Sequence, residues 1–211
     1  IDTYPAGTKS LLPETYPDET PLRGEWNAPT LISPHNPSII YHGMQYVLMS
    51  KDAGDTWEII SPDLSYNDPK KRGDINFQTV SVLDESPLRP GLIYAGTDDG
   101  RVWRTKDWGK SWTEIRSGAV PQKFVSRIVA SRYKIGTVYM TQTGRRDDDL
   151  QVYIWKSTDF GATWKDISGN IPVGPVNVIR EDPVNPDILY AGTDGAVYVT
   201  KNGGEKWDVL G

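Results

Sequence analysis

The feature that most constrains the fold of this chain is an eight-residue pattern that occurs four times. The pattern is [Ser/Thr]-x-[Asp/Asn]-x-Gly-x-x-Trp, and it reads SKDAGDTW at 50–57, TKDWGKSW at 105–112, STDFGATW at 157–164 and TKNGGEKW at 200–207. The tryptophans that end the four copies are 55, 52 and 43 residues apart. A period of this size suits a four-stranded β-propeller blade with loops of variable length.

The same order of strand-like segments returns around every copy. A first β-type run is followed by a turn, a strand that ends in small residues, a short alternating strand that leads into the pattern, and a last strand after the Trp. The first runs are TLIS (30–33), TVSVLDES (79–86), VSRIVAS (125–131) and VNVIRED (176–182). Four short alternating strands per unit, with turn residues between them, predict up-and-down antiparallel sheets. No segment repeats apolar residues at helical spacing, so we expect very little helix.

We therefore expect an all-β fold: a β-propeller, or a partial propeller, of four up-and-down four-stranded blades. The blades should span about 24–65, 75–117, 124–169 and 175–211. Residues 1–23 contain four Pro and no strand alternation, which indicates a connecting or wrapping segment. Four blades leave open sheet edges unless they close on themselves, and open edges invite pairing. A partial propeller completed by another chain or segment is thus expected, with a small closed ring as the alternative.

Every residue type in the repeated pattern has a structural explanation. The Asp carboxylate can accept backbone N–H groups of a turn, the Gly permits a positive φ, the Ser/Thr hydroxyl offers a further local bond, and the Trp buries a large ring. The fourth copy keeps its flanking strands although Asn202 replaces the Asp and Lys206 the second Ser/Thr. We interpret the four copies as hairpin joints, whose structural residues are Ser50, Asp52, Gly54, Trp57, Thr105, Asp107, Gly109, Trp112, Ser157, Asp159, Gly161, Trp164, Thr200, Asn202, Gly204 and Trp207.

Composition excludes several classes of partner and chemistry. The formal charge of −5 gives no electrostatic reason to expect nucleic-acid binding. The chain has no Cys, which excludes disulfides and thiolate catalysis. No apolar run approaches the ~20 residues of a membrane-spanning helix, so no membrane insertion is expected. We expect no cofactor.

The repeats resemble the Asp-box (BNR) repeat of sialidases, sortilin-type receptors and xyloglucanase-type glycoside hydrolases. The segments RGEWNAPTLISPHNPSIIYHG (23–43), SPLRPGLIYAGTDDG (86–100) and VNVIREDPVNPDILYAGTDGAVYV (176–199) resemble the C-terminal half of large bacterial sortilin-like (VPS10-type) proteins, often labelled glycosyl hydrolases. The resemblance implies further blades in a larger exported protein, extracellular or periplasmic. It implies little about activity, because a fold does not fix a function.

Carboxylates at two strand ends are the candidates for glycosidase chemistry, which needs two such groups about 5–5.5 Å or 6.5–9.5 Å apart. They are Asp84 and Glu85 in the second unit, and Glu181 and Asp182 in the fourth. We expect both pairs at the same place in their units, which argues against catalysis, because one site rarely needs the same pair twice. They would then be polar strand ends. In the tandem-propeller hydrolases that the chain resembles, the two catalytic Asp residues come from different propellers, so four blades would supply one at most.

Arginines and tryptophans are the candidates for binding. Arg127 and Arg180 lie on equivalent first strands, where they could line a channel as salt-bridge partners or bind a carboxylate. Trp103, Trp108 and Trp155 do not end an Asp box, and could form a sugar-stacking or protein-contact surface or pack between blades.

The run GRRDDDLQ (144–151) offers Asp147, Asp148 and Asp149 as candidate ligands for a cation such as Ca²⁺. Consecutive residues of a strand point to opposite faces, so all three cannot easily share one ion. Arg–Asp pairing and a solvated loop are the alternatives.

Three functions remain open. The first is a non-catalytic propeller segment that serves as a protein- or carbohydrate-binding or assembly module. Its partners would be the remaining blades of its own polypeptide or another protein chain, or a polysaccharide. The second is part of a glycoside hydrolase of the xyloglucanase-like tandem-propeller type. The third is a purely structural piece of a larger polypeptide.

Overall fold

The computed structural model describes residues 21–71 and 78–210, which form four antiparallel sheets of four strands each. Blade 1 contains β1 (Thr30–Ile32), β2 (Ile40–Gly43), β3 (Val47–Ser50) and β4 (Glu58–Ile59). Blade 2 contains β5 (Val80–Glu85), β6 (Ile93–Thr97), β7 (Val102–Thr105) and β8 (Thr113–Glu114). Blade 3 contains β9 (Phe124–Ala130), β10 (Val138–Gly144), β11 (Asp149–Ser157) and β12 (Lys165–Asp166). Blade 4 contains β13 (Val176–Glu181), β14 (Leu189–Thr193), β15 (Val197–Thr200) and β16 (Asp208–Val209).

The predicted all-β class and the four up-and-down blades are confirmed, because the strand order within every sheet follows the chain. The helical content of the described residues is two short 3-10 turns, η1 (Pro69–Lys71) and η2 (Arg145–Asp147). Among the described residues no helix is long and apolar enough to cross a membrane.

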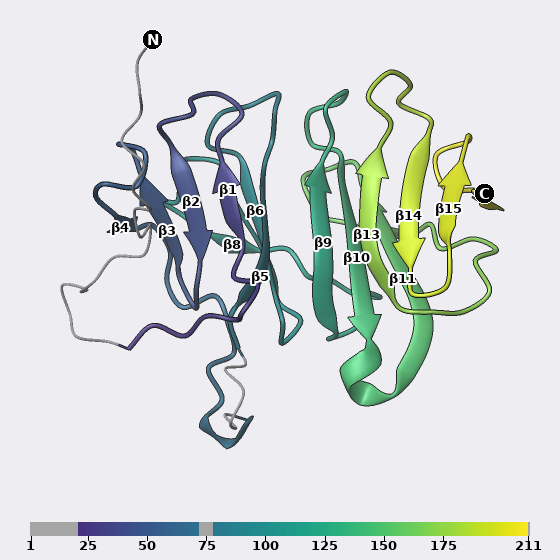
Figure 1. The fold of residues 1–211 in the computed structure, drawn as a ribbon, viewed down its shortest axis with the longest axis horizontal. Helices are drawn as coiled ribbons and strands as arrows, with labels where there is room; N and C mark the ends of the chain where they lie inside the picture. The colour runs from purple at the N-terminus through teal and green to yellow at the C-terminus, as the bar shows by residue number, and fades with distance from the viewer. Residues whose placement is uncertain (1–20, 72–77, 211) are drawn as a thin grey trace, which may run out of the picture.

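Figure 1 shows blades 1 and 2 in one half of the molecule and blades 3 and 4 in the other. The first strands β1, β5, β9 and β13 contact one another in succession along the inner side. Blade 1 and blade 4 lie at opposite ends of the long axis of the molecule (Figure 1). The chain is therefore a partial propeller, and the alternative of a small closed ring is wrong.

The hydrophobic core consists of three interfaces between successive blades. Each blade places one face, here called its near face, on the preceding blade, and the other, its far face, toward the next. The interface of blades 1 and 2 contains Tyr41, Val47, Met49, Leu83, Ile93 and Ala95. The interface of blades 2 and 3 contains Val82, Tyr94, Val102, Ile128, Met140 and Trp155. The interface of blades 3 and 4 contains Tyr139, Ile154, Ile179, Leu189, Ala191 and Trp207.

Blade 2 illustrates the hydrogen bonds that build an Asp box. The Thr105 hydroxyl accepts the Gly109 N–H at 2.9 Å and donates to the Asp107 carboxylate at 2.7 Å. Asp107 also accepts the backbone N–H of Ser111 at 2.9 Å and its hydroxyl at 2.7 Å. Gly109 has a φ of +88°, which few other residues adopt without strain. The hairpin joint is thus closed by bonds between residues two and four positions apart.

The box tryptophans also join neighbouring blades. The indole Nε1–H groups of Trp112, Trp164 and Trp207 donate to backbone carbonyls of the preceding blade at 2.7–2.8 Å; the acceptors are Ile60, Ile115 and Ile167. The Nε1 atom of Trp57 in blade 1 is buried and has no hydrogen-bond partner within residues 21–71 and 78–210. The box therefore has a second role, between blades, that its local sequence does not reveal.

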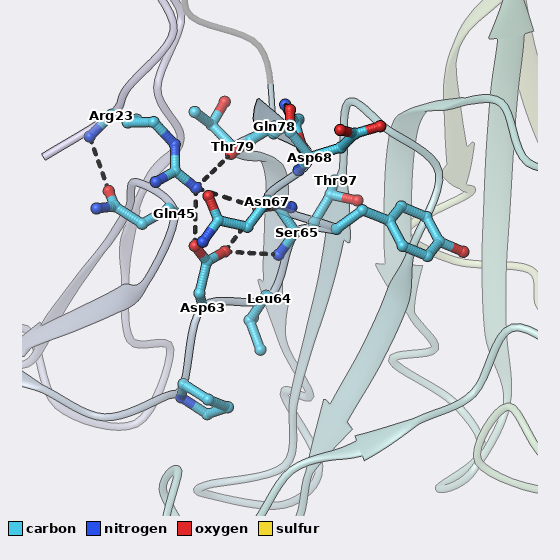
Figure 2. Close-up of polar contacts among 12 residues, drawn as sticks. Arg23, Gln45, Asp63, Leu64, Ser65, Asn67, Asp68, Gln78, Thr79 and Thr97 are labelled. Atoms are coloured by element: carbon cyan, nitrogen blue, oxygen red, sulfur yellow. Dashed lines mark hydrogen bonds and ion pairs between the residues drawn. The ribbon is translucent and has the colours of Figure 1, made fainter. Parts of the chain in front are cut away.

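A polar cluster around Arg23 fixes the chain where it enters blade 1 (Figure 2). The Arg23 Nη2 group donates to the Asp63 carboxylate at 2.7 Å and to the Ser65 hydroxyl at 3.2 Å. Its backbone N–H donates to the side chain of Gln45 at 2.7 Å, and Gln45 is fully buried. Arg23 thereby ties the chain to blade 1 and to the loop after β4. The predicted connecting segment 1–23 lies mostly outside the described residues, and the domain boundaries stay a prediction.

Candidate functional site

The axial pocket is a cavity of about 290 Å³ lined by residues of all four first strands. It lies where these strands end. One ring of its wall is formed by Leu31, Asp84, Val129 and Arg180. These four residues are structurally equivalent, because each pairs with a tyrosine of the second strand of its own blade: Tyr41, Tyr94, Tyr139 and Tyr190.

This register corrects the expected match between the two carboxylate pairs. Glu85 pairs with Ile93 and Glu181 pairs with Leu189, so the two glutamates are equivalent. Asp84, however, is equivalent to Arg180, and Asp182 lies beyond the end of β13. The prediction that both pairs occupy the same place is therefore wrong: the pairs are offset by one residue.

The two glutamates are engaged in joints between blades. Glu85 accepts the Gly91 N–H at 2.8 Å and the hydroxyl of Tyr41 in blade 1 at 3.3 Å. Glu181 accepts the hydroxyl of Ser131 at 2.6 Å and the backbone N–H of Arg132 at 2.8 Å, both from blade 3. Structural donors thus hold both oxygens of Glu181, whereas both bonds to Glu85 end on Oε1 and its buried Oε2 has no hydrogen-bond partner among the described residues.

Asp182 is a turn residue. It accepts the backbone N–H groups of Val184 and Asn185 at 2.8 and 2.9 Å and the hydroxyl of Tyr190 at 2.9 Å. The two backbone bonds, followed by the tyrosine hydroxyl, lower the pKa of this carboxyl. The geometry is that of an Asx-type turn, which favours the ionised form.

Asp84 differs from the other three candidates. One carboxylate oxygen accepts the Ala130 N–H at 2.7 Å, and within the described residues the carboxylate makes no other hydrogen bond. Burial of the carboxylate raises its pKa to about 7, although the Ala130 N–H and the nearby Arg180 and Arg127 oppose the shift. Asp84 therefore titrates near neutrality at the wall of the axial pocket.

The two candidate arginines lie close to Asp84 without forming an ion pair. Arg127 is half-buried, and its Nε is buried with no hydrogen-bond partner in the part of the chain that the structure describes. Burial, and then the charge of Arg180, lower the pKa of Arg127. Arg180 is exposed, and its guanidinium donates to the Ile179 carbonyl at 3.4 Å. Of the two, Arg180 lines the axial pocket and Arg127 does not, and neither guanidinium group has a carboxylate within 4 Å among the described residues.

The three candidate tryptophans do not form one surface. Trp155 is buried and donates to the Gln142 side chain at 3.0 Å. Trp103 donates to the Leu64 carbonyl at 2.7 Å. Trp108 is 44% exposed and lies on the outer rim.

Two of the three aspartates at the end of η2 and the start of β11 share one partner, Lys123. Asp147 and Asp149 both approach the Lys123 ammonium, at 2.9 and 3.1 Å, and Asp149 also accepts the Tyr153 hydroxyl. Asp148 ends η2 in the left-handed conformation, with a φ of 54°. In the described ranges, no group of three or more His, Asp and Glu side chains is placed to hold a metal ion.

Leu31 and Val129 were not among the residues expected at a site. They complete the apolar wall of the axial pocket next to Arg180. An alignment of the four units on Tyr41, Tyr94, Tyr139 and Tyr190 would have found them, because these tyrosines mark the same rung in every blade.

The chain is similar in sequence to xyloglucanases and to vacuolar sorting proteins. The chain is 26% identical over 178 residues to a xyloglucanase of a Paenibacillus species, which covers 75% of this chain and 16% of that protein. It is 24% identical over 155 residues to the vacuolar protein sorting/targeting protein 10 of Arthroderma benhamiae, which covers 67% of this chain and 10% of that protein. The chain thus spans a small part of the curated relatives it matches.

Solved structures agree on the fold. The crystal structure of the GH74 xyloglucanase from Xanthomonas campestris superposes with a TM-score of 0.68 at 21% identity, over 89% of this chain and 30% of that one. The model of the Sortilin-Vps10 family, described as sortilin, neurotensin receptor 3, matches residues 45–171. Because this match covers more than half of the 211 residues, the chain belongs to the Sortilin-Vps10 family.

Proposed function

We propose that this chain is a non-catalytic propeller segment that binds an anionic ligand in the axial pocket and is assembled with further blades. Binding is favoured over catalysis by the hydrogen bonds and ion pairs that the charged groups make or lack. Glu85 and Glu181 accept structural hydrogen bonds between blades, whereas Arg127 and Arg180 have no carboxylate partner among the described residues.

The pocket suits a carboxylate attached to an apolar group. Guanidinium groups bind carboxylates through charge-assisted, often paired hydrogen bonds. Arg180 lines the pocket and has no carboxylate partner among the described residues, so a ligand carboxylate could pair with it. Leu31, Ile32 and Val129 add apolar surface beside Arg180. Asp84 lies near both arginines, and its ionised form would repel an anion, so binding should tighten as the pH falls below about 7.

N-acetyl-leucine and its amide test this proposal, because they differ in the carboxylate alone. Calorimetric titration should give binding of the acid and at least about tenfold weaker binding of the amide, since a charge-assisted bond is lost. Arg180→Met should weaken binding of the acid by a similar factor, and Arg127→Met should weaken it less, because Arg127 lies near Asp84 without lining the pocket. Arg145→Met is the control, because Arg145 is exposed and paired with Asp194. Equal binding of acid and amide would contradict the proposal.

The assembly role rests on the far face of blade 4. Val197 on this face is 45% exposed, whereas the equivalent Val102 of blade 2 is fully buried under blade 3. A further Asp-box blade, from the remainder of the polypeptide or from another chain, would bury this face. Light scattering on the purified chain should give a mass above that of one chain, and Val197→Glu should return it to one chain. A monomer at every concentration would count against assembly through this face.

A glycoside hydrolase of the xyloglucanase type is the second candidate. The favouring observation is Asp84, because a carboxyl with a pKa of about 7 suits a general acid. The second carboxylate would come from outside the described blades. Release of sugar from xyloglucan by this chain, lost in Asp84→Asn and kept in Asp182→Asn, would support this candidate. Absence of turnover, together with carboxylate binding, would favour the first.

We also propose an extracellular or periplasmic location for the larger protein, following the resemblance to exported propeller proteins. Fractionation of the producing cells would test it. Recovery of the protein with cytoplasmic markers would contradict it.

A further inference from the structure

A second concave surface lies on the outer rim, between β3 and β4 of blade 1 and the Asp box of blade 2. It is a cavity of about 510 Å³, here called the Trp108 groove. Its floor and walls are formed by Ile39, Met49, Ile59, Ile60 and Trp108. Lys51, Glu58 and Lys110 stand at its rim. The groove is thus apolar inside and charged at its edge.

The corresponding groove between blades 2 and 3 is charged. Arg104 occupies the position of Met49, and Glu114 that of Ile59. Phe160 occupies the position of Trp108, and the Lys106 ammonium covers its ring at 4.1 Å from the ring centre. Arg104 also donates to the Phe160 carbonyl at 2.8 Å.

The groove between blades 3 and 4 is also polar. Lys156, Asp166 and Gly203 stand at the same three positions. The propeller architecture therefore does not require an apolar groove at this place. Among the described blades, all three positions are apolar only in the groove between blades 1 and 2.

Trp108 is also not required by the Asp box. The equivalent residues Ala53 and Gly203 adopt the same left-handed conformation, with φ of 58° and 69°. Trp108 has a φ of 57° and the equivalent Phe160 a φ of 64°, so the turn of the box imposes this conformation whatever side chain stands there. The Trp108 ring lies so close to Gly91 that a Cβ there would be 2.4 Å from the indole Cδ2. The indole is therefore held in place while 44% of the residue is exposed.

We infer that the Trp108 groove docks an extended peptide segment of a partner protein, which inserts a large apolar side chain against Trp108 and carries an acidic residue beside it. The aliphatic floor of Ile39, Met49 and Ile60 fits an apolar side chain better than a sugar, whose hydroxyls need polar partners. Aromatic residues in such pockets are typical anchors of interfaces.

The charges at the rim of the groove indicate which residue of the bound peptide should stand next to its apolar side chain. Lys51 and Glu58 pair with each other at 2.5 Å, whereas Lys110 forms no ion pair within 4 Å among the described residues and only Asp107 of its own box lies close enough to interact with its charge. An acidic residue on the ligand would complement it. The outer edge of β4 has no strand beside it in the described part of the chain, and an extended peptide can pair with such an edge. The inference is independent of the axial pocket, since the two share no residue.

A library of random heptapeptides displayed on phage is the probe. Peptides selected on the wild-type chain should share a large apolar residue next to Asp or Glu. Their affinity should fall at least about tenfold in Trp108→Gly and in Ile59→Glu, as for interface anchors. Phe160→Gly is the matched control, because it removes the equivalent aromatic of the next blade, and it should leave affinity within about twofold.

Both variants introduce residues that other blades already carry at these positions, namely Gly203 and Glu114, so the fold should persist, and thermal melting checks it. Failure to select any peptide on the wild type would overturn the inference. So would equal binding by all variants, or a selected motif without an apolar anchor. Binding of soluble oligosaccharides to the groove, lost in Trp108→Gly, would replace the peptide by a sugar and also overturn it.

Discussion

Blade 2 and blade 4 present almost the same residues on their far faces and meet different surroundings. Val82, Tyr94, Gly96 and Val102 of blade 2 correspond to Val178, Tyr190, Gly192 and Val197 of blade 4. In blade 2 these residues pack against blade 3, and Tyr94 and Val102 are fully buried. In blade 4, Val197 is 45% exposed. Blade 4 therefore carries an interface pattern that no described part of this chain covers.

Gly96 and Gly192, on the far faces of blades 2 and 4, show the same difference in surroundings as distances. A Cβ on Gly96 would lie 2.4 Å from Cγ1 of Val125 in blade 3, so glycine is needed for the next blade to approach. A Cβ on Gly192 would meet a single close atom, Cγ1 of Val178 in the same blade, at 2.7 Å. In blade 2 the glycine is explained by the neighbouring blade 3. Blade 4 keeps the same glycine, although none of the described blades lies beside it.

The largest effect is expected from Gly96→Ala compared with Gly192→Ala. The first should lower the free energy of unfolding by about 2–3 kcal/mol, because the added methyl group would overlap the Val125 side chain of blade 3. The second should cost below about 1 kcal/mol, because the half-buried Val178 can turn away. Urea unfolding of both variants measures the difference. Equal costs would mean that the far face of blade 4 is already covered in solution.

The comparison extends to the indole joint between blades. Trp164→Phe removes the 2.8 Å bond to the Ile115 carbonyl and should cost about 1 kcal/mol beyond the loss of ring volume. Trp57→Phe removes a buried donor that has no acceptor among the described residues, and should cost about 1 kcal/mol less than Trp164→Phe. The same unfolding experiment measures both. A larger loss in Trp57→Phe would show that its Nε1 finds an acceptor in solution.

How far the sequence predicts the molecule depends on the range of the interactions. The Asp-box bonds join residues two and four positions apart, so four copies of the box were enough to predict the blades. The partner of Trp112 is Ile60, 52 residues earlier, and no local pattern indicates it. The sequence therefore predicts the joint within a blade and not the one between blades.

The axial site depends on register. Register shifts near the starts of β5 and β13, between Val80 and Val82 and between Val176 and Val178, fix which side chains share a rung. Without that register, Asp84 and Glu181 are indistinguishable as strand-end carboxylates. The unpaired state of Arg127 also arises from neighbours on other blades, which single-strand reasoning cannot supply.

A smaller effect is expected where the two blades differ at the axis, with Asp84 in blade 2 and Arg180 in blade 4. The pKa of Asp84 is raised to about 7 in the folded chain, so the folded state holds a proton that the unfolded state has released between about pH 4 and pH 7. Stability from this group is present below its unfolded pKa and is lost as the pH rises through about 7. Asp84→Asn should therefore gain thermal stability relative to wild type as the pH rises from about 5 to 8. A difference that does not change with pH would show that the carboxylate is solvated.

The smallest effect is expected at the boxes themselves, where blade 2 has Asp107 and blade 4 has Asn202. The Ser111 hydroxyl, then its backbone N–H, then the Thr105 hydroxyl lower the pKa of Asp107 to about 2. A lowered carboxyl pKa stabilises the fold above the unfolded value near 4 and ceases to do so as the pH falls through about 2.

Asp107→Asn should accordingly lower the melting temperature slightly at neutral pH and narrow the difference between neutral and acid conditions. Asn202→Asp should raise the melting temperature by less than Asp107→Asn lowers it. Asn202 already accepts the Lys206 backbone N–H at 3.0 Å, but Lys206 supplies no hydroxyl for the second carboxylate oxygen. Calorimetric melting of both variants at neutral and acid pH measures the pair. Equal changes in melting temperature for the two variants would contradict this prediction. They would show that a carboxylate stabilises the box whether or not a hydroxyl donates to its second oxygen.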